Sequence, residues 1–289
     1  MAWNEKRSKE RVKANDFSDF DLNIQDLART MDFTNLGRKD VRRAQGVHLY
    51  VDVPNFHRAV EDAGNNLQKQ RKLLRASSVL RRVQGELMDQ DDVGDIQRQT
   101  VRAHGIVYRP YDGDENSKDG NRAKLAVTHA ITQNTYVLEI FNDVFDDVRD
   151  FSSAVGLSSG TSYLANVGKT GKRELISLGT CANLAAKIIG GRDTITITSE
   201  MYNVLPDFLQ EYFVKDEAVS GVQSYRATGL RWNVYPELAK KLGVIWKPNV
   251  WQIKTEEHRD ALPLSEIEIS EATDLVDVSN LSERNCKRT

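Results

Sequence analysis

The sequence predicts an α/β protein in which a mostly antiparallel sheet is packed by helices. Short runs rich in β-branched and aromatic residues, such as 47–53 and 193–199, are typical of strands. Longer stretches with apolar residues at helical spacing, such as 56–88 and 122–148, lie between them. Some of the strand-like runs follow each other closely enough to form hairpins, and a hairpin joins antiparallel neighbours.

The composition is that of a globular protein and excludes several classes of partner. Of the 289 residues, 39% are hydrophobic and 28% are charged. The formal net charge of −2 offers no basic field for nucleic acid. No run approaches the roughly 20 apolar residues of a membrane span, and no secretion signal is visible. We therefore expect a cytoplasmic location, with no nucleic acid and no membrane as partner. The two cysteines, Cys181 and Cys286, lie too far apart in the sequence to suggest a disulfide framework or zinc spacing.

Changes in composition divide the chain into three parts. Residues 1–46 are highly charged and predict an arm or a contact between subunits. Residues 47–252 carry the alternating strand and helix patterns of one domain. Residues 253–289 are acidic and polar without periodicity, which predicts a flexible tail.

The first predicted strand, 47–53, contains one charged residue, Asp52, among apolar neighbours. Burial of an unpaired carboxylate is costly, so Asp52 should have a cation or a metal ion beside it. The simpler alternative is that Asp52 ends the strand and caps the next helix. Tyr50 lies two residues earlier and therefore on the same face of the strand. Its ring would line a pocket beside the carboxylate or belong to the core.

The strand is followed by a helix over 56–88 with a break at Gly64-Asn65-Asn66. Its buried stripe consists of Leu73, Leu74 and Leu80. A hairpin is then expected from strands at 96–101 and 105–108, with Arg102-Ala103-His104 as the connection. A turn-rich acidic loop over 112–120 precedes the next helix, which begins at Arg122.

Two paired strands within 154–178 lead into a helix that carries Asn183 and Lys187. These residues are four apart and share one helical face, which would present an amide and a cation together. Such a pair suits a sugar and its phosphate, although many ordinary helices expose one. The opposite side is apolar and suits packing against a sheet, through Leu184, Ala185 and Ile188.

The stretch Gly179-Thr-Cys181-Ala-Asn183-Leu-Ala-Ala-Lys187 resembles the signature helix of the class III nucleotidyl cyclases. The resemblance implies that Asn183 orients the ribose and that Lys187 stabilises charge developing on the phosphate. The family usually has Arg at the second position, and Lys keeps the charge but loses the bidentate fork. It also implies a ferredoxin-like core, a nucleoside triphosphate substrate, and a head-to-tail homodimer whose active sites are shared between subunits.

The stretch Asp52-Val53-Pro54-Asn55-Phe56 is similar to the first metal-binding motif of that family. By this resemblance Asp52 holds two ions of manganese or magnesium (Mn²⁺ or Mg²⁺), and Val53 contributes its backbone carbonyl. Phe56 becomes a substrate-binding residue. Oxygen ligands together with a triphosphate suit either ion.

The family's hairpin carries a base-selecting Lys and, four residues later, a second metal-binding Asp. One alignment places that Asp at Asp114, but residues 115–120 are too polar to form the strand that must follow. The preferred alignment uses 105–108 as this strand. It places Arg98 at the base-selecting position and Arg102 at the position of the second Asp, so both become substrate-binding candidates.

With Arg102 at that position, the second metal ligand stays open. Asp95 is the nearby candidate, Asp112 or Asp114 would serve in the other alignment, and a remodelled site would have no second ligand.

The two arginines, together with Tyr50, make the chain most similar to the bacterial Pycsar pyrimidine cyclases of phage defence. The family's second base contact falls on Ile176, whose side chain cannot hydrogen-bond to a base. Arginine donates but never accepts, and a uracil edge presents two carbonyl acceptors. The resemblance therefore implies a cyclase that uses UTP ahead of CTP. The alternatives are a purine cyclase and a non-catalytic regulator with a cyclase fold.

Overall fold

The computed structural model describes residues 5–14, 22–27, 36–37, 39–91, 93–98, 102–108, 115–148, 150–169, 172–219 and 221–244. The chain divides into two units, Met1–Leu242 and Gly243–Thr289, and the described helices and strands lie in the first. The predicted tail over 253–289 lies outside the described residues. No helix in the described ranges combines the length and apolarity of a membrane span.

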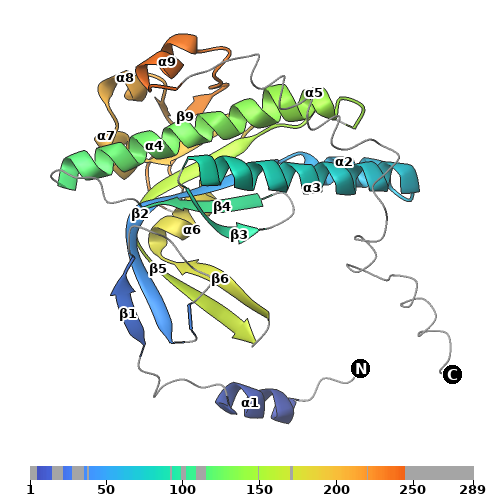
Figure 1. Ribbon diagram of the computed structural model, residues 1–289, viewed down its shortest axis with the longest axis vertical. Coiled ribbons are helices and arrows are strands. Elements are labelled where there is room, and N and C mark those ends of the chain that lie inside the picture. Colours follow the sequence, from blue (N-terminus) through green and yellow to red (C-terminus); the bar gives the residue numbers. More distant parts are fainter. Residues whose placement is uncertain are drawn as a thin grey trace. The chain divides into compact units, whose positions relative to one another are not determined.

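The described strands form one nine-stranded sheet with the order β3-β4-β2-β5-β7-β9-β8, to which β1 adds on β2 and β6 adds on β5 (Figure 1). All strand pairs are antiparallel except β1 with β2 and β5 with β7, which confirms the mostly antiparallel sheet. The strands are β1 (Asn23–Asp26), β2 (Asp40–Asp52), β3 (Gly94–Arg98), β4 (Arg102–Val107), β5 (Ala154–Lys169), β6 (Lys172–Leu178), β7 (Thr194–Thr198), β8 (Val214–Lys215) and β9 (Ser224–Thr228).

The helices account for most of the remaining described residues. The break predicted at 64–66 is present, and Asn66 caps the second helix by accepting a hydrogen bond from Lys69 N at 3.1 Å. The helices are α1 (Glu5–Ala14), α2 (Phe56–Ala63), α3 (Leu67–Gln90), α4 (Glu115–Thr135), which continues as the π-helix η1 (Tyr136–Phe141) and α5 (Asn142–Val144), α6 (Thr180–Lys187), α7 (Ser199–Val204), α8 (Asp207–Gln210) and α9 (Pro236–Lys241).

The sheet has two differently covered faces, and glycines mark where helices approach them. Gly105 lies opposite Leu49, and a Cβ on Gly105 would lie 3.3 Å from Met88 Sδ of α3. Gly156 lies opposite Tyr50, and a Cβ there would lie 2.1 Å from the Ala185 carbonyl oxygen of α6. Residues opposite one another in an antiparallel pair share a face. Leu49 therefore faces α3, whereas Tyr50 faces α6.

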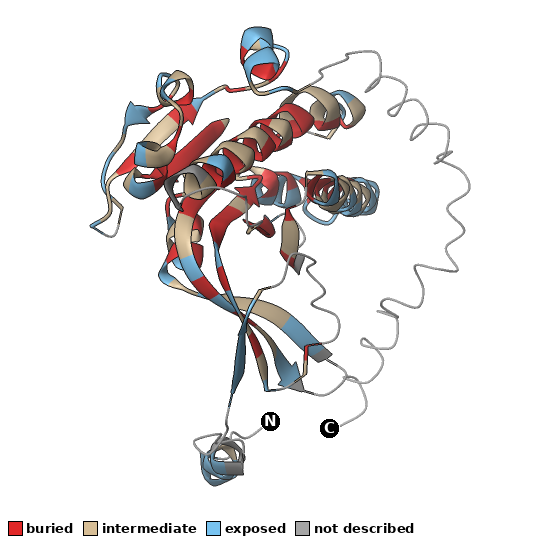
Figure 2. Cartoon of the chain, turned by 60° about the vertical axis from the view of Figure 1, so that its left-hand side comes forward, coloured by how far each residue is buried: buried red, intermediate tan, exposed pale blue. Residues whose placement is uncertain are grey.

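Burial follows this layering. Figure 2 shows buried residues concentrated on the inner sides of α3 and α4 and in the central strands. In β2 the apolar side chains facing α3 and α4 are fully buried, namely Val47, Leu49 and Val51. Toward the far end of β5 and along β6 exposure rises, as at Val167 and Leu178. The central part of β2 is thus rigidly held, which fixes the residues on its α6 side as well.

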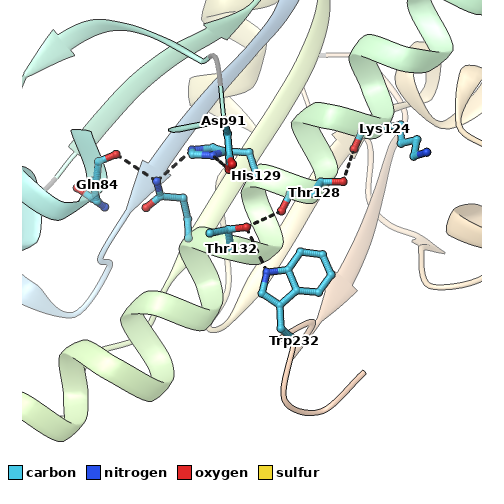
Figure 3. A network of polar contacts seen from close by, with 8 residues as sticks. Gln84, Asp91, Lys124, Thr128, His129, Thr132 and Trp232 are labelled. Atoms are coloured by element: carbon cyan, nitrogen blue, oxygen red, sulfur yellow. Dashed lines mark hydrogen bonds and ion pairs between the residues drawn. The ribbon is translucent and has the colours of Figure 1, made fainter. Parts of the chain in front are cut away.

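A buried polar network joins α4 to α3 (Figure 3). His129 Nδ1 of α4 lies 2.7 Å from Asp91 Oδ2, just beyond the end of α3. Gln133 Nε2 lies 3.0 Å from His129 Nε2 and donates to the Gln84 carbonyl at 3.4 Å. These contacts link the end of α3 to α4, so the network has a structural role in the layer that covers the sheet.

The hairpin is confirmed, but its connection was misplaced. Residues 102–104 were predicted to join the two strands, whereas they form the first half of β4, with Ala103 opposite Arg98. Pairing with β2 explains the difference, because β4 runs beside β2 from Val47 to Asp52 and this contact outweighs the weak strand preference of Arg and His. Residues 115–120 do not form a strand, as argued from the sequence, but the loop predicted over 112–120 was wrong for them, because α4 begins at Glu115 and not at Arg122.

Candidate active site

Asp52 lies at the carboxyl end of β2, between β4 and β5. Its side chain is only 11% exposed. Oδ1 accepts a hydrogen bond from Val53 N at 3.0 Å, and Oδ2 accepts one from Arg102 Nη2 at 3.0 Å. Arg102 is the direct cross-strand neighbour of Asp52 and its side chain is 55% exposed. The cation that the isolated carboxylate was expected to need is thus supplied by the chain itself.

Tyr50 lies on the same face as Asp52, and its ring is fixed by stacking. The ring lies parallel to that of His104, with centroids 4.0 Å apart and an interplanar angle of 12°. Burial raises the pKa of Tyr50, and the nearby Arg102 opposes that shift. The ring of Tyr50 is only half buried, so part of it stays available to a ligand on the face that carries Asp52.

The sequence interpretation missed a histidine pair behind Tyr50. His48 Nδ1 lies 2.9 Å from His104 Nε2, and His48 Nε2 lies 2.8 Å from Ser162 Oγ and 3.4 Å from Ser177 Oγ. Burial lowers the pKa of His48 to about 4, and burial together with His48 lowers that of His104 to about 3. Both rings are therefore neutral at pH 7. The alternating polar residues 48, 50 and 52 in an apolar strand were the available signal.

Helix α6 presents Asn183 and Lys187 on an exposed face, as the sequence predicted. Neither side chain makes a hydrogen bond or ion pair with another residue that the structure describes. On the other side, Ala185 and Ile188 are buried against the sheet. Strand β5 and helix α6 lie so close together that any side chain at Gly156 would collide with the backbone of α6. An amide and an ammonium group are thus free to bind a ligand, on a helix that is firmly seated.

Two residues of the predicted metal motif are held in the core. Phe56 is buried and its ring stacks on Phe151, with centroids 5.4 Å apart. Its backbone N donates to the Val53 carbonyl at 3.0 Å. That carbonyl keeps a second lone pair, so the hydrogen bond does not prevent it from serving as a ligand. The ring of Phe56 contributes to packing below the site.

Asp95 is not brought to Asp52. It lies opposite Gly105 and so on the face of α3, where its Oδ2 is 3.4 Å from Arg81 Nη2 of that helix. Asp52 points to the other face of the sheet, so the position of Asp95 gives no support for a shared metal ion. The side chain of Arg98, and the whole of Asp112 and Asp114, lie outside the described residues.

The described residues around Asp52 offer few ligands for a divalent ion. Across the described ranges, no cluster of three or more His, Cys, Asp or Glu side chains is placed to hold a metal. One carboxylate and one backbone carbonyl remain at the site, Asp52 and Val53. Mg²⁺ is commonly held by one or two carboxylates together with substrate phosphates, which matches this sparse set of ligands. Within the described ranges Asp52 is the one carboxylate found at this site, and it is paired with Arg102.

The fold is that of the class III cyclases. It resembles a class III adenylyl cyclase-like ATP-binding protein from Pseudomonas aeruginosa, with a TM-score of 0.68 and 21% identity over 91% of this chain and 54% of that one. It also resembles the adenylyl cyclase CyaB from P. aeruginosa, with a TM-score of 0.53 and 14% identity over 65% of this chain and 95% of that one. A third similar structure is the guanylyl cyclase Cya2, with a TM-score of 0.51 and 13% identity over 65% of this chain and 93% of that one.

Sequence comparison points within that class to a particular relative. No protein-family model matches the chain. A uridylate cyclase from P. aeruginosa is 24% identical over 191 residues, which cover 65% of this chain and 36% of that protein. The chain thus spans about a third of the uridylate cyclase and about half of the ATP-binding protein. The resemblance to class III cyclases that the sequence indicated is confirmed.

Proposed function

We propose that this protein converts a nucleoside triphosphate into its 3′,5′-cyclic monophosphate and pyrophosphate. The observation that carries the proposal is the cyclase fold with Asp52 at the end of β2 and with Asn183 and Lys187 free on α6. In this reaction the 3′-oxygen forms a bond to the α-phosphorus while the bond to pyrophosphate breaks. The hydroxyl proton leaves to solvent or to the departing pyrophosphate.

Each of these groups has a part in that displacement. Asp52 and the Val53 carbonyl would hold the divalent ion, which lowers the pKa of the 3′-hydroxyl and attracts phosphate oxygens when bound. Asn183 would hold the ribose so that the 3′-oxygen lies in line with the leaving group. Lys187 would donate to the phosphate as negative charge accumulates on it.

A site shared between two copies of the chain fits the positions of these groups. Asp52 is paired with Arg102 of its own chain, whereas the side chains of Asn183 and Lys187 make no hydrogen bond or ion pair with a described residue. We infer a homodimer in which α6 of one subunit completes the site at Asp52 of the other. Each dimer would then contain two equivalent sites, related by the twofold axis.

The substrate is proposed to be a pyrimidine triphosphate, UTP ahead of CTP. The similarity to a uridylate cyclase supports this choice. So does Ile176, which lies in β6 opposite Ala165 and offers no hydrogen bond to a base edge. A cyclic pyrimidine nucleotide would be a second messenger, and a role in bacterial defence against phages follows from the resemblance to the Pycsar enzymes.

The second candidate is a nucleotide-binding protein without cyclase activity. It is favoured by the Arg102–Asp52 ion pair, which occupies the carboxylate, and by the neighbour described as an ATP-binding protein. This candidate predicts saturable binding of a triphosphate with no cyclic product.

Incubation of the full chain with each of the four triphosphates and Mn²⁺, followed by chromatography of the products, distinguishes these possibilities. We expect cyclic UMP to form fastest, with pyrophosphate in equal amount. The variant Lys187→Ala serves as the inactive control. ATP used as well as UTP would defeat the pyrimidine assignment, and binding without any cyclic product would establish the second candidate.

A further inference from the structure

Arg102 stands where the class III resemblance places a second metal-binding acid, and the structure shows what it does there. In the register of β2 and β4 it lies directly opposite Asp52. Cβ atoms of such a pair are about 5 Å apart, so both side chains enter the same space. The guanidinium indeed reaches the carboxylate, with Nη2 at 3.0 Å from Oδ2.

We propose that the Arg102 guanidinium takes the place of one metal ion, so that the site binds the triphosphate with a single divalent ion and one arginine. This inference rests on the proposed function. The inference goes beyond the proposed function by assigning the number of ions and the source of the second positive charge at Asp52.

The sum of the charges at the site supports the exchange of one metal ion for the Arg102 guanidinium. Two divalent ions held by two carboxylates would present a formal charge of about +2 to the substrate. One divalent ion with Asp52 and Arg102 also gives about +2, because one carboxylate and one ion have been replaced by one guanidinium. The exchange therefore keeps the attraction for a triphosphate while it removes the ligands for a second ion.

The solvent exposure of the Asp52 and Arg102 side chains supports the same exchange. Asp52 is nearly buried, so its charge needs a partner close by at all times. Arg102 is more than half exposed and presents several donors in a planar fork that matches phosphate oxygens. It can contact the carboxylate in the free protein and still reach a bound triphosphate without any opening of the core.

Two measurements that need no turnover test the proposal. Crystals soaked with Mn²⁺ and a 3′-deoxynucleoside triphosphate, which lacks the attacking hydroxyl, should show one manganese anomalous peak at Asp52 in the wild type. In solution without nucleotide, Mn²⁺ should bind Arg102→Gln about five- to tenfold more tightly than wild type, as a competing cation worth roughly 1 kcal/mol is removed. Arg102→Lys should stay close to wild type.

Arg43→Gln is the matched control, because Arg43 of β2, like Arg102 of β4, pairs with an aspartate, in this case Asp26 at 2.7 Å. Its Mn²⁺ affinity should equal that of wild type. Two anomalous peaks at Asp52 in the wild type would overturn the proposal, and so would an unchanged affinity in Arg102→Gln. Absence of cyclic product from every triphosphate would instead defeat the proposed function, so the two failures are distinguishable.

Discussion

The two faces of the central sheet both carry buried polar groups, but they use them differently. On the side of α3 and α4, His129 contacts both Asp91 and Gln133, and Gln133 donates to the backbone carbonyl of Gln84 (Figure 3). On the side of α6, the histidine pair leads through Tyr50 toward Asp52 and Arg102, whose guanidinium is exposed. The first network links two helices and reaches the surface only at the partly exposed Asp91, whereas the second ends where a ligand can bind. Stability should therefore depend on both faces, and activity mainly on one.

The largest expected effect is that of Asp52→Ala. We expect kcat for cyclisation to fall by about a thousandfold or more, because the only carboxylate described at the site is removed. Arg102 is exposed enough to be hydrated without its partner, so the variant should fold and dimerise. Product formation and size-exclusion chromatography check both points. Turnover close to wild type would contradict the role of Asp52.

Mixed dimers test whether the α6 side of one subunit completes the site of another. Asp52→Ala and Lys187→Ala homodimers should each be inactive, since every site lacks one group. After equal mixing and subunit exchange, half of the dimers are mixed and each has one intact site, so activity should recover to about a quarter of wild type. Subunit exchange is verified with differently tagged chains. No recovery after confirmed exchange would argue for sites within single chains.

A pair of glycine substitutions tests the contribution of each face of the sheet to stability and activity. In Gly156→Ala the new methyl group meets the Ala185 carbonyl of α6, and in Gly105→Ala it meets Val93 and Met88 on the other face. Each should cost about 1–3 kcal/mol of unfolding free energy through overpacking. Only Gly156→Ala should also lower kcat, by about a hundredfold, because α6 carries Asn183 and Lys187 and a shift of 1 Å misplaces them.

Denaturant unfolding and kinetics below the transition measure the two effects. Equal loss of kcat per folded molecule in Gly105→Ala would show that the faces do not differ in this way.

The histidine pair predicts a dependence of stability on pH. The pKa values of His48 and His104 in the folded protein, about 4 and about 3, lie below the ordinary 6.5 of an unfolded chain. The unfolded state therefore binds more protons, and stability falls as the pH drops below about 6.5. Each histidine should contribute about 1.4 kcal/mol per pH unit between there and its folded pKa. Urea unfolding from pH 7 to 4.5 should show this slope.

In His104→Gln the slope should decrease by about the share of one histidine. His57→Gln is the control, because His57 is an exposed residue of α2. The assignment fails if His104→Gln has the same pH dependence as wild type.

The sequence predicted the strands and helices around the site well, because their signals are local. The apolar run at 47–53 and the Asn183–Lys187 face depend on spacing within a few residues. The contacts of Asp52 depend instead on the register between β2 and β4, which are some 50 residues apart in the chain. The sequence indicated that Asp52 needs a cation, but placed Arg102 in a turn. His48 and His104, 56 residues apart, become a pair only through the same register.

The smallest expected effect concerns base selection at Tyr50, whose ring lies on the same face of β2 as Asp52 and stacks on His104. Base–aromatic stacking is worth about 1–3 kcal/mol and depends little on the base, so its loss should weaken binding of every triphosphate. The hydroxyl can distinguish bases, because a polar group left unpaired penalises the wrong partner. Tyr50→Phe keeps the stack on His104 and removes only the hydroxyl.

We therefore expect Tyr50→Phe to reduce the preference for UTP over ATP several-fold with little change in stability. Tyr50→Ala should raise KM for all four triphosphates. Measurement of kcat/KM for each triphosphate in both variants decides between the two contributions. If selectivity is unchanged in Tyr50→Phe, the base is recognised elsewhere, and Arg98 becomes the next residue to substitute. If KM is also unchanged in Tyr50→Ala, the ring belongs to the core, and the α6 face is less open to the ligand than its exposed groups indicate.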